Sequence, residues 1–131
     1  MKVDILAIGS HPDDVELGCS GTIAKEISKG KKVGILDLTR GELGTRGSAE
    51  IREIEANDAA KILNVAFRDN LEFKDGFFKI DDNHQLKLIK VIRKYRPDLI
   101  LCNAPDDRHI DHPRGAKLVI DSCFFKWTQK D

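Results

Sequence analysis

Four short apolar segments alternate with longer segments of helical character, and this alternation constrains the fold more than any other feature of the chain. The apolar segments span residues 3–8, 32–39, 65–73 and 98–102, and the helical segments span 17–29, 48–63, 83–95 and 113–125. Such alternation is typical of parallel strands joined by helical crossovers. The sequence therefore predicts one α/β domain over residues 1–131, with a mainly parallel sheet.

Local signals mark where these helices begin and end. Gly30 follows the first helical segment, and Ser48 is placed to cap the second. Pro97 ends the third helix, while Pro113 suits the first position of the fourth. No linker, repeat or low-complexity segment divides the chain, which agrees with a single domain.

The charge balance and the apolar content exclude several classes of protein. Lys+Arg and Asp+Glu both number 22, so no electrostatic attraction to nucleic acid or to an anionic membrane is expected. No apolar run approaches the roughly 20 residues of a membrane span. The N-terminal segment is short, is interrupted by Asp4 and resembles a strand and not a signal peptide. We expect a cytoplasmic protein.

The number and spacing of the cysteines predict neither disulfide bonds nor a zinc site made of cysteines. The three cysteines are an odd number and form no C-x-x-C pair, so neither a disulfide scaffold nor a cysteine zinc site is predicted. Any metal in this chain would have to be bound by histidine and carboxylate groups.

Unusual polar residues gather in three loops, each of which directly follows a predicted strand. These loops contain residues 11–14, 40–47 and 106–112. Ligands of open α/β sheets bind beyond the carboxyl ends of the strands. The three loops are therefore expected to form one active site.

The first of these loops contains His11, Pro12, Asp13 and Asp14. If the chain enters a helical turn there, His11 and Asp14 can face one point, and Asp13 points elsewhere. The alternative is that both aspartates simply favour a helix N-terminus, where their charge opposes the dipole.

The last loop ends in His109-Ile-Asp-His112, in which two histidines three residues apart share a face and Asp111 lies between them. A polar loop with a helix cap is the alternative. Because two separate loops both carry histidine and aspartate, a shared metal site is the better explanation of the pair.

Two histidines and one aspartate leave an open coordination position, which is the arrangement of a catalytic zinc site. Zinc lowers the pKa of a bound water to about 7 and polarises a carbonyl. Asp13 could then act as the general base. His109 could stabilise an oxyanion or protonate a leaving group, with Asp111 holding its tautomer or charge.

Arg52 and Glu42 are candidates for substrate binding. Arg52 lies on the same helical stripe as Ala56 and Leu63, and an arginine facing inward needs an anionic or polar partner. It would suit a substrate carboxylate. The alternative is an ion pair with Glu16 or Glu42. Glu42, in the glycine-rich loop, is expected to line the sugar pocket.

Four motifs together resemble the PIG-L/LmbE-like family of zinc-dependent N-acetylglucosaminyl deacetylases, and the match runs through nearly the whole chain. They are His11-Pro-Asp-Asp14, Arg40-Gly-Glu-Leu-Gly-Thr-Arg-Gly-Ser48, Ile51-Arg-Glu-Ile-Glu55 and His109-Ile-Asp-His112.

The resemblance implies a Rossmann-like three-layer sandwich and a metal site of three ligands, His11, Asp14 and His112. Zinc is the expected metal, and Fe²⁺ also suits this ligand set. Frequent homo-oligomers, often hexamers, are implied as well. Family members are usually longer, so this chain is expected to be a C-terminally shortened form that corresponds to the N-terminal part of the family domain.

The resemblance also implies the roles of the remaining residues. Asp13 would be the base, His109 the acid or oxyanion group with Asp111 as its partner, and Arg52 a substrate ligand. The expected reaction is hydrolysis of an acetamide C–N bond by attack of zinc-bound water. The closest similarity is to the bacillithiol-biosynthesis deacetylases, which act on N-acetylglucosaminyl-malate, and Asn70-Leu71 followed by Asp75-Gly76 fits that branch.

Two other functions use the same residues. A non-haem Fe(II) oxygenase also employs two histidines and one carboxylate. A shortened relative could instead hold metal or sugar without turnover. A dinucleotide-binding role is not expected, because no G-x-G-x-x-G follows the first strand.

Overall fold

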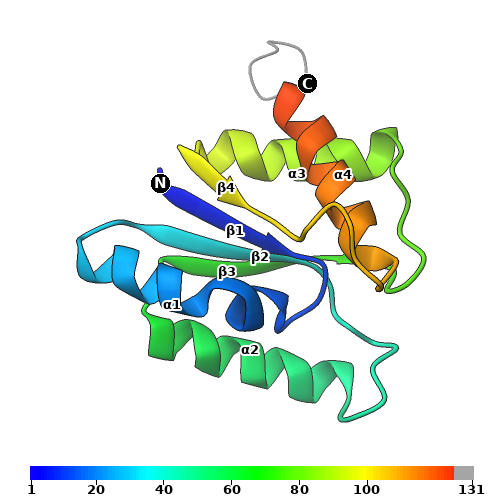
Figure 1. The fold of residues 1–131 in the computed structure, drawn as a ribbon, viewed down its shortest axis with the longest axis horizontal. Coiled ribbons are helices and arrows are strands. Elements are labelled where there is room, and N and C mark those ends of the chain that lie inside the picture. Colours follow the sequence, from blue (N-terminus) through cyan, green and yellow to red (C-terminus); the bar gives the residue numbers. More distant parts are fainter. Residues whose placement is uncertain (126–131) are drawn as a thin grey trace.

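A sheet of four parallel strands, in the order β3-β2-β1-β4, forms the centre of the fold (Figure 1). The computed structural model describes residues 1–125. The strands are β1 (Ile5–Gly9), β2 (Val33–Thr39), β3 (Phe67–Phe73) and β4 (Leu99–Leu101). The helices are α1 (Asp14–Ser28), α2 (Ala49–Leu63), α3 (Asp82–Tyr95) and α4 (Asp111–Phe124). The predicted α/β class with a parallel sheet is confirmed.

The helices cover both faces of the sheet, so the fold has three layers. Figure 1 shows α1 and α2 on one face and α3 and α4 on the other. The chain builds β1, β2 and β3 in one direction and then returns to place β4 on the free side of β1. The direction of winding reverses between β1 and β4. Open sheets bind ligands at such a switch point.

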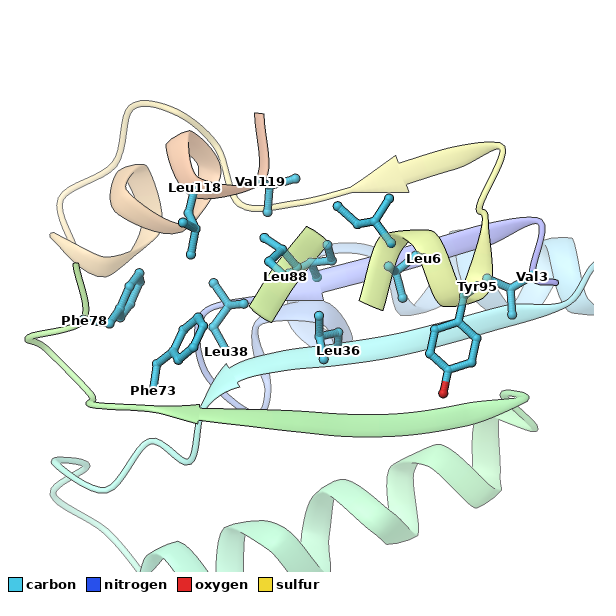
Figure 2. Close-up of a cluster of buried hydrophobic side chains, with 12 residues drawn as sticks. Val3, Leu6, Leu36, Leu38, Phe73, Phe78, Leu88, Tyr95, Leu118 and Val119 are labelled. Carbon is cyan, nitrogen blue, oxygen red and sulfur yellow. The ribbon is translucent and has the colours of Figure 1, made fainter. Parts of the chain in front are cut away.

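The larger part of the core lies between the sheet and the pair α3 and α4 (Figure 2). Successive strand residues point to opposite faces, so Leu6 of β1 and Leu36 and Leu38 of β2 all face this side. They meet Leu88 of α3 and Leu118 of α4, which are fully buried. The intervening residues Ile5, Ala7, Val33 and Ile35 pack with α1 on the other face.

A buried ion pair joins β2, β3 and α1 on the second face of the sheet. The Arg68 side chain, only 4% exposed, donates two hydrogen bonds to Asp37 (2.8 and 3.0 Å) and two to Glu16 (3.0 and 3.1 Å). Burial raises the pKa of Asp37 to about 6, although Arg68 opposes this shift. The pairing holds the first turn of α1, which bears Glu16, against the sheet.

Two helices begin earlier than the sequence pattern predicts. α1 begins at Asp14 instead of Leu17, and α4 begins at Asp111 instead of Pro113. The polar residues at these points belong to first helical turns, whose apolar periodicity is too short to detect. The predicted cap is confirmed, since Ser48 Oγ accepts the Ile51 N–H at 3.2 Å. Within residues 1–125, none of the helices combines the length and apolarity that a membrane crossing requires.

Replacing Leu88 by alanine tests the assignment of the main core. Leu88 is 0% exposed, and removing a buried leucine side chain costs about 2–5 kcal/mol. Leu86 lies on the same helix but is 43% exposed, so Leu86→Ala should change stability far less. Urea denaturation of both variants makes the comparison. Equal destabilisation by the two substitutions would contradict this packing.

Candidate active site

The carboxyl ends of the strands surround an open cavity of about 620 Å³. The loop after β1, the glycine-rich loop after β2, the turn after β3 and the segment before α4 all contribute to it. The three loops singled out by their polar residues therefore meet in space. The turn after β3, with Asp75 and Gly76, joins them although its sequence carries no histidine.

The structure brings together the three residues predicted as metal ligands. His11, Asp14 and His112 each offer one ligand atom, and these atoms lie within 4.8 Å of one another. Asp14 Oδ2 is 3.2 Å from His112 Nε2 and 3.5 Å from His11 Nδ1. Two imidazole nitrogens and one carboxylate oxygen fit the donor set of a catalytic zinc site.

Asp14 is held as a carboxylate at the centre of this group. Its Oδ2 accepts the backbone N–H of His11 at 3.0 Å and the side-chain amide of Asn103 at 3.3 Å. Burial alone would raise the pKa of Asp14, but the hydrogen bonds from His11 outweigh it and lower that pKa to about 2. An ionised carboxylate is the form that binds a cation.

Three residues that the sequence did not single out connect β1, β4 and α4 beneath the site. Asn103, just after β4, accepts the Ser10 N–H at 2.9 Å, and Ser10 Oγ donates to the Asp111 carbonyl at 2.8 Å. A side chain at Gly115 would collide with Ser10 Oγ. The sequence signal that could have identified Ser10 and Asn103 was their position just after strands β1 and β4.

The imidazole of His11 is surrounded by carboxylates. Its Nε2 is 2.8 Å from Asp111 Oδ2 and 3.0 Å from Asp75 Oδ1, while Nδ1 faces Asp14. Burial lowers the pKa of His11, but hydrogen bonds with Asp14 and Asp111 outweigh it, so the pKa rises to about 9. A metal must therefore displace a proton to bind this histidine.

The carboxylate of Asp111 pairs with a different histidine from the one expected. Its fully buried carboxylate contacts His11 and accepts the Gly76 N–H at 3.0 Å, and only its backbone N–H reaches His109 Nδ1, at 3.1 Å. Asp111 is the first residue of α4, so its side chain enters the protein beneath that helix. The expected pairing of this carboxylate with His109 is replaced by pairing with His11.

His109 lies beside the ligand group and is exposed to the cavity. Its ring centroid is 4.7 Å from that of His11 and 5.0 Å from that of His112. Because Nδ1 accepts the Asp111 N–H, Nε2 is the nitrogen that carries a proton in the neutral ring. The free edge of His109 can therefore donate to a bound substrate.

Asp13 occupies a backbone conformation that non-glycine residues rarely adopt, with φ 138° and ψ −21°. Such strain costs about 1–3 kcal/mol and clusters at functional sites. Its side chain is 53% exposed and lines the cavity. Partial burial raises the pKa of Asp13, an effect that Arg52 opposes. A carboxylate with a raised pKa is a stronger base.

Arg52, predicted to bind substrate, makes its contacts with neighbouring loops of the protein. Its guanidinium donates to the Gly41 and Pro12 carbonyls, both at 3.1 Å, and lies 3.4 Å from Asp13 Oδ2. The expected alternative, an ion pair with Glu16 or Glu42, is absent among the contacts of residues 1–125. Arg52 therefore ties the loops after β1 and β2 together and holds Asp13.

The second loop packs closely around Arg52, and Gly41 in this loop has a φ of 64°, which favours glycine. A Cβ atom at Gly41 would lie 2.7 Å from Arg52 Nη1, and one at Gly44 would lie 2.6 Å from it. Glu42, predicted to line the sugar pocket, instead accepts the Asp75 N–H at 3.0 Å. Its carboxylate therefore joins the loop after β2 to the turn after β3.

The raised pKa of His11 gives the metal-free protein a pH-dependent stability. A folded-state pKa of about 9, against 6.5 for the free side chain, means that protonated His11 stabilises the fold below about pH 6.5. This contribution is lost as the pH rises through 9. Urea denaturation in the presence of chelator should show a fall in unfolding free energy over this range that His11→Gln weakens. Parallel pH profiles for the two proteins would rule out this titration.

Comparison with a solved structure supports the fold. The conserved protein TT1542 from Thermus thermophilus superimposes with a TM-score of 0.93 at 41% identity, over 98% of this chain and 58% of that one.

Curated relatives include two named deacetylases. The diacetylchitobiose deacetylase of Thermococcus kodakarensis is 33% identical over 131 residues, covering 92% of this chain and 49% of its own length. A probable N-acetyl-alpha-D-glucosaminyl L-malate deacetylase of Bacillus subtilis is 28% identical over 139 residues, covering 96% and 63%. The predicted closest similarity to the malate-specific branch is not confirmed, because the other identity is higher.

The family itself is shown by a match to a family model. The model of PIG-L, described as GlcNAc-PI de-N-acetylase, matches residues 6–123. The chain spans roughly half to two thirds of the length of the relatives named above. Since the match covers most of the sequence, the chain belongs to the PIG-L family.

Proposed function

We propose that the protein removes the acetyl group from an N-acetylglucosaminyl conjugate by metal-dependent hydrolysis of the amide. The observation that carries the proposal is the convergence of His11, Asp14 and His112 at the switch point of the sheet. Family membership supports the same reaction class, because the two curated relatives compared above are named deacetylases. It also disfavours the Fe(II) oxygenase that the ligand set alone would permit.

Zinc is the metal that we propose, with Fe²⁺ as an alternative for the same ligands. His11 would bind through Nδ1 and His112 through Nε2, since these nitrogens face Asp14. When bound, such an ion lowers the pKa of a water to about 7 and polarises a carbonyl.

The surrounding residues supply proton transfer and orientation. Asp13 borders the open cavity and would accept the proton of the attacking water. The Nε2–H on the free edge of His109 would donate a hydrogen bond to the oxyanion, and the proton that Asp13 takes from the water would pass to the departing amine. Arg52 would hold Asp13 in its strained conformation through the contact at 3.4 Å. Backbone carbonyls accept two of the guanidinium N–H groups of Arg52, so substrate binding through Arg52 would use the remaining ones.

For the substrate, we propose N-acetylglucosaminyl-malate, the bacillithiol precursor, with diacetylchitobiose as the second candidate. The malate conjugate is favoured by an exposed cation, Arg108, which lines the cavity and is available to a carboxylate. The disaccharide is favoured by the higher identity to the diacetylchitobiose deacetylase. Comparing the two substrates with an Arg108→Gln variant separates them, since only the anionic substrate should lose affinity.

The activity is tested by acetate release with and without added Zn²⁺. Asp13→Asn should lower the rate by about 10²–10⁴, the usual contribution of a general base. Asp58→Asn, an exposed carboxylate on α2, provides the matched control. His112→Ala should abolish both metal binding and turnover. Acetate release that needs neither metal nor Asp13 would refute the mechanism.

The family resemblance further leads us to propose a homo-oligomer, with a hexamer as the expected size, in the cytoplasm. Large exposed apolar side chains on α1 and α2 support association, among them Leu17 (83% exposed), Ile54 (61%) and Ile62 (84%). Light scattering of the purified protein measures the oligomer size. A monomer at micromolar concentration would contradict the proposal.

A further inference from the structure

The two histidines of the proposed metal site are supported in different ways. His112 Nδ1 has a partner on the surface, Asp107 Oδ2 at 3.0 Å, whose side chain is 38% exposed. His11 Nε2 instead faces two carboxylates that are almost completely buried, those of Asp111 (0% exposed) and Asp75 (7%). Burying a second carboxylate beside one imidazole is costly, so its contact with His11 calls for a functional explanation.

The two carboxylates determine which nitrogen of His11 is available as a ligand. A carboxylate accepts hydrogen bonds, so the proton of the neutral ring is held on Nε2, which lies 2.8 Å from Asp111 and 3.0 Å from Asp75. The lone pair is then on Nδ1, the nitrogen that faces Asp14. Partners of this kind orient metal-binding histidines and raise their basicity.

Asp75 is itself fixed from both sides. Its Oδ2 accepts the Leu43 N–H at 2.9 Å, and its own N–H donates to Glu42 at 3.0 Å. Oδ1 is thereby directed at His11. The next residue, Gly76, has a φ of 76°, and its N–H donates to Asp111 at 3.0 Å. The turn after β3 therefore holds both carboxylates that contact His11.

We infer that Asp75 is a positioning residue which, together with Asp111, orients the imidazole of His11 for metal binding. The inference rests on the metal site of the proposed function. It assigns to the turn after β3 a part in metal affinity, although this turn contributes no ligand. The cost of losing such a partner is typically about 10–100-fold in metal affinity.

The test is the dissociation constant for Zn²⁺ or Co²⁺, measured by chelator competition on metal-free protein without substrate. Asp75→Asn keeps the size of the side chain, but one amide group cannot accept from both Leu43 and His11. We expect this variant to bind metal about 10–100-fold more weakly and to change the visible absorption of bound Co²⁺. Asp69→Asn is the matched control, because it makes the same change in a β3 carboxylate that accepts the Tyr95 hydroxyl instead of facing His11, and it should leave metal affinity close to the wild-type value.

The thermal unfolding of each metal-free variant separates positioning from a purely structural role. If Asp75 only joins the loops, Asp75→Asn will lower the melting temperature while metal affinity stays unchanged, which would overturn the inference. Wild-type protein that binds metal through His112 but is insensitive to Asp75→Asn would overturn the inference alone. Wild-type protein that binds no metal would overturn the proposed function as well.

Discussion

The pairing of β1 with a parallel neighbour on each side is the constraint on which the rest of the structure depends. β2 lies along one edge of β1 and β4 along the other. Groups 100 positions apart in sequence, such as those of His11 and Asp111, therefore come into contact. Bringing distant residues together costs chain entropy, and here the strand pairing and the two core clusters supply the compensating free energy. The loops only have to follow strand ends that are already adjacent.

The sequence was sufficient to predict the parallel sheet and the convergence of His11, Asp14 and His112, because strand ends are visible in the apolar pattern and histidines next to aspartates are conspicuous. It could not place Asp75 beside His11, since β3 has a weak apolar pattern and an aspartate before glycine is ordinary turn chemistry. It also paired Asp111 with His109, two residues away, instead of with His11. The direction of that side chain depends on where α4 begins and on the contact between α4 and β1.

Polar groups around the candidate site are bound to one another before any ligand arrives. Carboxylates, backbone N–H groups and one guanidinium link the loops after β1, β2 and β3 to α4. Catalysis benefits from groups whose orientation is fixed in advance, because no reorganisation is then needed in the transition state. The strained backbone of Asp13 persists for the same reason, since the surrounding contacts over-determine its position.

The contact between Arg52 and the glycine-rich loop makes the shape of the candidate pocket depend on α2. The guanidinium fills the space that Cβ atoms at Gly41 and Gly44 would need, and it bonds to the Gly41 carbonyl. The conformation of this loop therefore depends on a side chain that belongs to α2. A change in how α2 packs on its face of the sheet would also change the shape of the candidate pocket at the sheet's edge.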